Sequence, residues 1–352
     1  MPSSDFDTTE VVTGGRPSGR APGSLGPGGL PSTRTLRSGR LGENAVGTFN
    51  LDNYAVTHQK MERQAYSDVM DESPLINGDF DVWQLGTSFA AAASGQYAAD
   101  GWQYATTGTV AVHTLSRSTD VPSVEPTTTQ NQGAYHLSNY SLLIDCTTID
   151  ATIAAADRCF IRNKIEGYDF RAIAQRQFTK SWWWKGPTGI GCVSFRNSAA
   201  DRSYVDEFEV VTADTWQWYY VTVPSSPSGG TWDYTNGIGL DVGFTLSSGT
   251  DTHGPKQSWN SANDIATASQ TNLTSSATNN ILLAQVKIVP GPVPARMSHV
   301  DFQRGLARCQ RRYQSTFPYG TVPAQNSGTY GLTYQTFTLG VAARGMEWRY
   351  AV

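Results

Sequence analysis

Short apolar runs separated by turn residues recur along most of the chain that follows Pro74. The runs are rich in Val, Ile, Thr and aromatic residues, and Gly, Pro, Ser and Asn stand between them. This pattern predicts many short strands, and therefore an all-β sandwich with its core between two sheets. The predicted strands are 110–117, 140–146, 160–165, 176–184, 191–196, 205–211, 216–223, 239–246 and 281–289. Polar and apolar positions alternate in Gln177–Trp182, which predicts that this strand buries one face.

Two other segments have the three- and four-residue spacing of a helix. Residues 51–72 contain no Gly or Pro, and we expect there a short helix for oligomerisation or docking that ends before Pro74. The second helix is predicted at 298–313, where cationic side chains lie near its C-terminal end and favour the helix dipole. These cations are Arg308, Arg311 and Arg312.

The first 50 residues have a composition of their own. Between Gly14 and Gly42 there are nine glycines and four prolines, and almost no residue that would bury an apolar face. Such a segment is either a disordered tail or an extended arm that becomes ordered on another protein, where its arginines pair with carboxylates. These arginines are Arg16, Arg20, Arg34, Arg37 and Arg40.

The chain is therefore divided into an extended arm at 1–50, a helix at 51–73, a sandwich at 74–313 that ends in a short helix, and the start of a C-terminal β region at 314–352. Its last residues have strand character. We expect either an edge strand there or a chain that continues beyond Val352.

Two connections within the sandwich attract attention. The segment Gly186–Cys192 has glycines but lacks the Lys-Ser/Thr ending of a phosphate-binding loop, so we expect a hairpin turn between strands. The segment Ser247–Asn280 reads as a long polar loop with one prominent large apolar residue, Trp259. Long loops in compact domains are usually functional or contact a partner.

Charge and composition narrow the function classes. Charged residues make up 16% of the 352 residues, against about 25% in an average soluble domain, and the formal net charge is −4. Nucleic-acid binding requires a cluster of Lys and Arg, so we do not expect it. No stretch approaches about 20 consecutive apolar residues, and no secretory leader pattern is present. We expect no membrane insertion, synthesis in a reducing cytosol and buried reduced cysteines, with a Cys146–Cys159 pair left open.

The sequence offers few groups for catalysis. Asp206, Glu207 and Glu209 lie on one predicted strand, and glycoside cleavage needs two carboxylates roughly 5 to 10 Å apart. Surface solubility explains these acids better than catalysis does. The histidines and cysteines show no metal-ligand spacing, and no GxSxG motif is present. We therefore predict no enzyme, no cofactor and no metal site.

Sugar binding has better candidates, because sugars present an apolar C–H face and a ring of hydroxyls. Two predicted loops combine aromatic planes with hydrogen-bonding side chains. Their candidate carbohydrate-binding residues are Trp232, Asp233, Tyr234, Trp259 and Asn260. The alternative is structural, with Trp232 and Trp259 closing the ends of the sandwich.

Several motifs resemble those of bacteriophage tail fibres and related receptor-binding virion proteins. They are PLINGDFDVWQ at 74–84, ADGW at 99–102, SWWWKG at 181–186, ADTW at 213–216, GTW at 230–232 and LARCQRRY at 306–313. Together they span about two thirds of the chain. The resemblance implies a carbohydrate-binding-like jelly roll on a virion appendage, generally trimeric, with a variable N-terminal anchor. The chain departs from the family at Gln285–Gly291, where an acidic strand end is usual, and in the short region after 313.

From these patterns we expect a structural component of a tailed phage or phage-like particle, such as a tail fibre, spike or fibre-attachment protein. Its arm would dock on other virion proteins of the tail, baseplate, neck or head, and its jelly roll would bind host-surface polysaccharide as a homotrimer. One alternative is a connector in the neck, baseplate or head spike that binds no ligand. A third, an enzyme that degrades capsule, is the least favoured.

Overall fold

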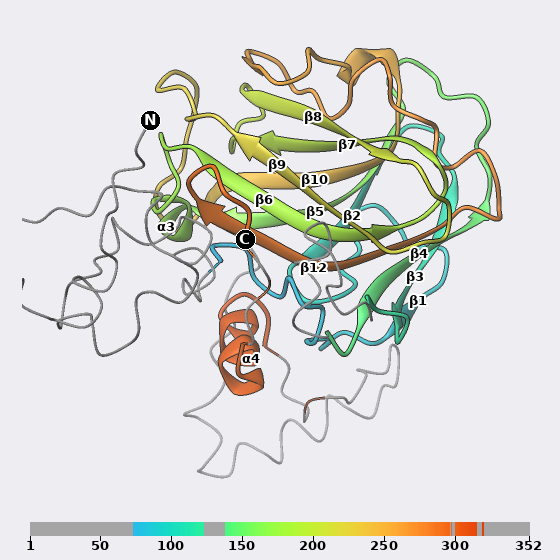
Figure 1. Ribbon diagram of the computed structural model, residues 1–352, viewed down its shortest axis with the longest axis horizontal. Coiled ribbons are helices and arrows are strands. Elements are labelled where there is room, and N and C mark those ends of the chain that lie inside the picture. The colour runs from blue at the N-terminus through green and yellow to red at the C-terminus, as the bar shows by residue number, and fades with distance from the viewer. Residues whose placement is uncertain (1–72, 123–137, 296, 298–299, 315–318, 320–352) are drawn as a thin grey trace, which may run out of the picture. The chain divides into compact units, whose positions relative to one another are not determined.

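The computed structural model describes residues 73–122, 138–295, 297, 300–314 and 319. Within these residues the chain forms two six-stranded sheets (Figure 1). The β12 sheet contains, in spatial order, β1 (Ser88–Phe89), β3 (Val112–Ser118), β4 (Ser141–Thr148), β12 (Asn280–Pro290), β6 (Phe178–Lys185) and β9 (Gln217–Val223). The β10 sheet contains β11 (Trp259–Asn260), β8 (Ser203–Val210), β7 (Gly189–Arg196), β10 (Ile238–Ser248), β5 (Arg158–Glu166) and β2 (Trp102–Thr107).

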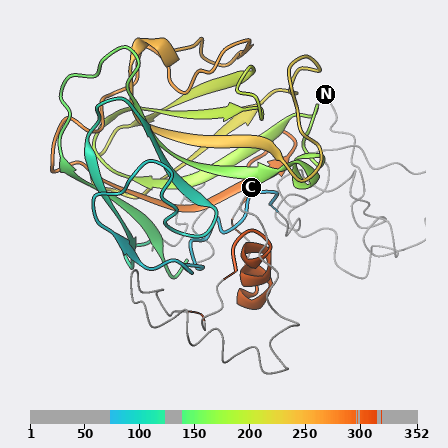
Figure 2. The ribbon, with the colours of Figure 1, turned by 180° about the vertical axis from the view of Figure 1, so that it is seen from behind.

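The predicted all-β jelly-roll sandwich is confirmed. Every pair of neighbouring strands in the two sheets is antiparallel, and the chain passes repeatedly from one sheet to the other. Figures 1 and 2 show the two layers from opposite sides. Each of the nine predicted strands coincides with an observed one. The prediction missed the two-residue strands β1 and β11 and the six-residue β2, in which Trp102 and Tyr104 face the core.

The prediction of a hairpin turn at 186–192 is wrong. Strand β6 pairs with β12 and β9, whereas β7 pairs with β8 and β10, so the segment between them crosses from one sheet to the other. Only three residues separate the end of β6 from the start of β7, so the length of this connection does not distinguish a hairpin from a crossover. Only the pairing partners, which lie far away in the sequence, distinguish the two cases.

Aromatic side chains fill the space between the sheets. Trp182 and Trp184 of β6 point inward, and each packs edge-on against Phe208 of the other sheet with ring centroids 5.2 Å apart. Phe244 of β10 lies 5.4 Å from Trp182 and 5.8 Å from Trp184. Such pairs stabilise a core beyond the area that they bury. The predicted burial of one face of this strand is confirmed for the face that carries Trp182 and Trp184.

Strand β6 nevertheless departs from the expectation that it buries a single face. All its residues from Phe178 to Trp184 are buried. On the outer side, Thr179 donates a hydrogen bond to the Gly291 carbonyl oxygen and Ser181 donates one to that of Ala295. The segment after β12 therefore lies across the outer face of β6. An alternating pattern predicts which residues share a face but not whether another segment covers it.

The predicted long loop at 247–280 is partly structured. It contains the short 3-10 helix η3 (Thr250–Thr252), and its strand β11 pairs with Tyr204 and Ser203 of β8. Ile265 and Ala266 of this segment are fully buried on the outer face of the β10 sheet. The segment therefore covers part of that face and leaves another part open.

The resemblance motifs hold the body together. Asn77 uses its side chain to bond Val82 and the Asp100 carbonyl oxygen, and its own carbonyl accepts the Trp102 indole N–H. A Cβ at Gly78 would lie 1.9 Å from the Val286 carbonyl oxygen, so only glycine fits this close approach. These contacts connect the 74–84 segment to the 99–102 segment and to β12.

The predicted C-terminal helix is confirmed as α4 (Phe302–Gln310), which Asp301 caps by accepting from the backbone N–H groups of Gln303 and Arg304. Two arginines near its C-terminal end, Arg308 and Arg311, also bind residues outside the helix. Arg308 donates to the Ser73 carbonyl oxygen at 2.8 Å, and Arg311 binds both oxygens of Glu166 at 2.5 and 3.0 Å. The arginines thereby attach the helix to the sandwich. The other short helix is α3 (Gly167–Phe170), directly after β5.

The predicted arm at 1–50 with its five arginines, the predicted helix at 51–73 up to Glu72, and almost all of the predicted β region at 314–352 lie outside the described residues. Among the residues that are described, no helix is long and apolar enough to cross a membrane.

Candidate functional site

A groove opens on the outer face of the β10 sheet, beside the part that the 247–280 segment covers. Its volume is about 330 Å³, at the lower end of the range of about 300 to 1,000 Å³ that is usual for ligand pockets. Side chains from β2, β5, β7 and β10 line it, together with loop residues. The lining residues with hydrogen-bonding or charged side chains include Thr106, Thr107, Arg158, Arg162, Lys164, Arg196, Asn197, Asp241 and Asn263.

Strand β5 supplies most of the charge in the groove. Its side chains alternate, so Arg158, Phe160, Arg162 and Lys164 point outward while Cys159 and its alternate neighbours face the core. The sequence RCFIRNK alternates cations with other residues, a signal from which this row could have been predicted. Three cations therefore lie on one face of this strand, and all three are partly exposed.

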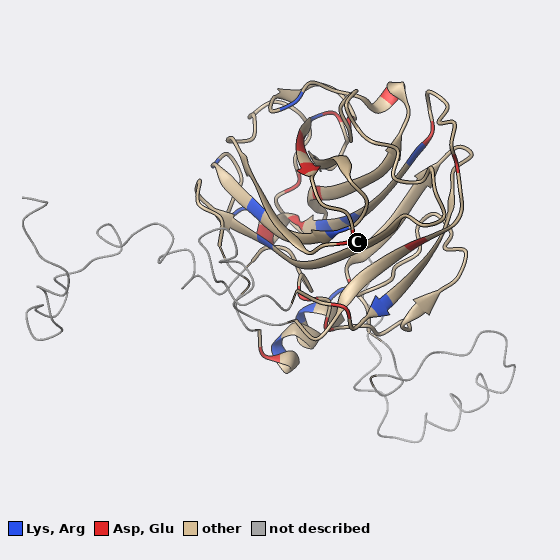
Figure 3. Ribbon diagram, turned by 45° about the vertical axis from the view of Figure 1, so that its right-hand side comes forward, with Lys and Arg blue, Asp and Glu red and all other residues tan. Residues whose placement is uncertain are grey.

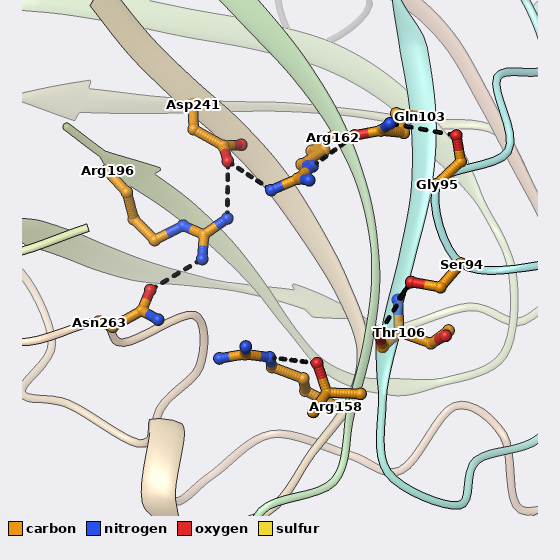
Figure 4. A network of polar contacts seen from close by, with 10 residues as sticks. Ser94, Gly95, Gln103, Thr106, Arg158, Arg162, Arg196, Asp241 and Asn263 are labelled. Atoms are coloured by element: carbon orange, nitrogen blue, oxygen red, sulfur yellow. Dashed lines mark hydrogen bonds and ion pairs between the residues drawn. The ribbon is translucent and has the colours of Figure 1, made fainter. Parts of the chain in front are cut away.

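Asp241 of β10 links the cations of two neighbouring strands (Figure 4). Its Oδ2 accepts from Arg162 Nη1 at 2.9 Å and from Arg196 Nη2 at 2.8 Å. Arg196 also donates to Asn263 Oδ1 at 2.9 Å, and Arg162 to Gln103 Oε1 at 3.0 Å. One carboxylate thus orients two guanidinium groups, each of which has a second neutral partner.

Burial and neighbouring cations lower the pKa values of two basic side chains in the groove, Arg196 and Lys164. Burial lowers the pKa of Arg196, Asp241 opposes this effect, and Arg162 lowers the pKa further. The pKa of Lys164 is also lowered, first by burial and then by Arg162. An arginine in a protein nevertheless stays charged. The groove therefore holds an excess of positive charge.

The floor of the groove offers no free aromatic plane. Phe160 is only 3% exposed, because the Arg196 guanidinium lies 4.9 Å and the Arg162 guanidinium 5.5 Å from its ring centroid. Ile265 packs against the same ring. The cations therefore use the aromatic face that a sugar ring would stack on.

The aromatic residues predicted as sugar contacts come together at another place. Trp232 and Trp259 meet edge-on with ring centroids 5.7 Å apart, and Phe170 of α3 stacks on Trp232 at 5.4 Å and on Tyr234 at 5.9 Å. All three predicted aromatics are half-buried and pack against the core. The structure thus brings residues from two distant loops into one cluster.

The polar groups of this aromatic cluster bond to the protein itself. Trp232 donates to the Gly229 carbonyl oxygen at 3.0 Å and Trp259 to that of Pro224 at 3.1 Å. Asp233 accepts from the backbone N–H and hydroxyl of Thr235, and Asn260 accepts from Ser203. These hydrogen bonds hold the side chains of the two loops in place. A role of the five residues in sugar binding stays a prediction.

The acids considered for catalysis do not converge. Glu207 pairs with Lys256 Nζ at 2.9 Å and accepts from Thr267 at 2.5 Å, while Glu209 is exposed. Asp206 is buried, and desolvation raises its pKa. The alternation along β8 turns Asp206 away from the two glutamates, as expected from the sequence. This strand provides no pair of facing carboxylates.

A thiol, a phenol and an imidazole meet inside the core. The Cys159 thiol donates to the Tyr104 oxygen at 3.2 Å, and that oxygen lies 2.8 Å from His113 Nδ1. Burial lowers the pKa of His113 to about 4 and raises that of Cys159 to about 12. Both shifts favour the neutral forms, the opposite of an activated thiolate next to an imidazolium. All four cysteines are buried and unpaired, in agreement with the sequence. No group of three His, Cys, Asp or Glu in the described part of the chain is arranged to hold a metal ion.

The chain was compared with known proteins. No protein-family model and no curated protein sequence matches it. Among solved structures it is similar to the enzymatically active domain of tailspike protein 4 from bacteriophage CBA120, with 14% identity and a TM-score of 0.29 over 57% of this chain and 21% of that one. This chain thus spans about a fifth of the tailspike chain.

Two further similar structures are smaller. One is a family 4 carbohydrate-binding module, with 11% identity and a TM-score of 0.30 over 62% of this chain and 99% of the module. The other is a sugar-binding protein assigned to Bacteroides thetaiotaomicron, with 11% identity and a TM-score of 0.32 over 62% of this chain and all of that one. These are distant likenesses that assign no function to the groove.

Proposed function

We propose that this chain is a structural component of a tailed phage or phage-like particle, and that its sandwich binds host-surface glycans in the groove of the β10 sheet. The observation that carries the glycan part is the groove itself. It has the volume of a ligand site, and four strands of a rigid sheet aim charged and polar side chains into it. Oriented hydrogen-bonding groups on rigid strands are what recognition of a hydroxyl-rich ligand requires.

The particle part of the proposal rests on the motifs of the sequence. The arm, through Arg16, Arg20, Arg34, Arg37 and Arg40, would anchor the chain on tail, baseplate, neck or head proteins, and the chain would assemble as a homotrimer. Three weak sites in one trimer bind a repeating polysaccharide far more tightly than one site does. The chain would then reside on the virion, as a fibre or spike.

A connector without ligand is the second candidate, and the edge strand β9 favours it. Its outward aromatic side chains include Trp218 and Tyr220, whose ring centroids are 5.7 Å apart, and Tyr220 is 54% exposed. Exposed aromatic rings on an edge strand are suited to contact with another protein. A capsule-degrading enzyme remains the weakest of the three, because the acids on β8 do not face one another.

A glycan array with the full chain tests the proposal. We expect binding, and we expect Arg158→Ala combined with Lys164→Ala to abolish it while folding is retained. The matched comparison is Trp232→Ala combined with Trp259→Ala. Loss of binding only in this second variant would move the site to the aromatic cluster. Absence of binding to any glycan would favour the connector, and release of sugar fragments would favour the enzyme.

A further inference from the structure

The groove concentrates positive charge in an acidic protein. Arg158, Arg162, Lys164 and Arg196 line it, against the single carboxylate of Asp241, while the whole chain has a formal net charge of −4. Most of the described ribbon is neither acidic nor basic (Figure 3). The excess is therefore a property of this groove and not of the surface in general.

The unused hydrogen-bonding capacity of the groove consists mainly of donors. Asp241 already accepts from two arginines through Oδ2, and its Oδ1 is buried without a hydrogen-bond partner among the described residues. Arg158 uses only its Nε, which donates to Thr107 Oγ1 at 3.0 Å, and Lys164 Nζ makes no hydrogen bond or ion pair within the described residues. A neutral hydroxyl both donates and accepts, whereas an anionic oxygen only accepts. Donors without matching acceptors therefore suit an anion.

The second observation is the covered ring of Phe160. Binding of a neutral sugar depends largely on stacking of its C–H face on an aromatic plane, and Arg196 and Arg162 occupy the plane here. Charge-assisted hydrogen bonds are about twice as strong as neutral ones and do not need such a plane. A ligand of this groove would have to gain its affinity from charge-assisted hydrogen bonds.

The neighbouring cations also repel one another. Burial and then Arg162 lower the pKa of Lys164, and Arg162 and Arg158 act in the same direction on the pKa of Arg196. An anion bound between these groups would relieve the repulsion, and the interaction would be strong because the groove is partly desolvated.

We infer that the groove selects an anionic polysaccharide, whose carboxylate or phosphodiester groups lie along the cationic row of Arg158, Arg162 and Lys164. This inference rests on the proposed glycan binding and specifies its substrate class. Uronic acid residues would supply carboxylates, and teichoic-acid-type polymers would supply phosphodiesters.

Calorimetric titration of the full chain tests the inference with matched polymers. The probes are polygalacturonate, the same polymer with methyl-esterified carboxylates, a glycerol-phosphate teichoic acid and neutral dextran. We expect at least one of the two anionic polymers to bind about tenfold or more tightly than the esterified and neutral ones. Affinity should fall as salt is raised. Preference between the two anionic polymers distinguishes the carboxylate from the phosphodiester.

Two double variants separate groove binding from general charge attraction. Arg158→Ala with Lys164→Ala should lose the preference for the anionic polymer by about tenfold or more. Lys185→Ala with Lys256→Ala removes the same formal charge outside the groove and should keep it. Thermal unfolding of both variants checks that they fold. Equal loss in both would overturn the inference.

The inference and the proposed function fail in different ways. Binding of dextran or the esterified polymer as tightly as of the anionic polymers would overturn the anionic selectivity and leave glycan binding intact. Absence of binding to all four polymers, together with a blank glycan array, would overturn both.

Discussion

The groove and the interior of the sandwich each bury a cation against an aromatic ring, with opposite consequences. Arg196 lies 4.9 Å from the ring centroid of Phe160 on the outer face of the β10 sheet, and Asp241 and Asn263 bind its guanidinium. Lys180 points into the core, where its Nζ lies 3.4 Å from the ring centroid of Phe244. No hydrogen-bond partner for this amine is present within the described residues.

The comparison shows how the two environments treat charge. The guanidinium remains charged, so burial of Arg196 is tolerated only with a carboxylate beside it. The lysine amine can lose its proton, and burial sets its pKa far below the usual lysine value. The groove thus keeps charged arginines, whereas burial in the core disfavours the charged form of the Lys180 amine, which packs among aromatic rings.

The largest effect should come from removing the counter-charge of the groove. Asp241→Asn leaves Arg196 and Arg162 without their carboxylate, and loss of one partner of a buried ion pair costs about 3–5 kcal/mol. We expect a decrease of that size in the free energy of unfolding, measured by urea titration. A decrease below about 1 kcal/mol would mean that solvent already screens the pair.

A slightly smaller loss of stability should appear when acid protonates His113 in the core. The pKa of His113 is about 4 in the folded protein, against 6.5 for the free side chain, so the unfolded chain binds the proton more readily between these values. Stability should therefore fall by about 3 kcal/mol as the pH decreases from about 6.5 to 4. The decrease should be absent from His113→Gln over the same range. An equal decrease in the unmodified protein and in His113→Gln would show that other groups cause the loss of stability at low pH.

The core lysine should show a pH dependence of the same sign in a more alkaline range, because its pKa is also lowered by burial. Its folded-state pKa is lowered, so below the unfolded value of about 10.4 the unfolded chain binds a proton that the folded chain does not. Stability should rise with pH from neutrality toward about 10. Lys180→Met should remove this rise and stabilise the protein at pH 7 by about 1–3 kcal/mol. Destabilisation at pH 7 would indicate that the amine has a role in packing that methionine does not replace.

The smallest effect is expected where a cation is exposed. Lys185 pairs with Asp120 at 2.7 Å, but the two side chains are 23% and 43% exposed. Lys185→Ala should lower the free energy of unfolding by no more than about 1 kcal/mol, and added salt should weaken even that. A loss as large as that of Asp241→Asn would contradict the contrast between buried and exposed pairs.

Much of the body of the protein could be predicted from its sequence, whereas the groove could not. The nine strands and helix α4 followed from spacing and turn residues, because these are local properties. The clustering of Trp232 with Trp259 did not, since it depends on two loops that meet only in the folded chain. Asp241 looked like an ordinary polar residue in an apolar strand, and its partners Arg196 and Arg162 lie 45 and 79 residues away.

Which side chains of β5 share a face follows from the sequence alone, because side chains of a strand alternate with a period of two. The order of residues alone therefore places four side chains on the same face, namely Arg158, Phe160, Arg162 and Lys164. Tertiary packing places β10 and β2 on either side of this row and β7 beyond β10, covers Phe160 with Ile265, and leaves the rest open as a groove. Strand pairing and coverage depend on contacts between distant segments, and local spacing carries no information about them.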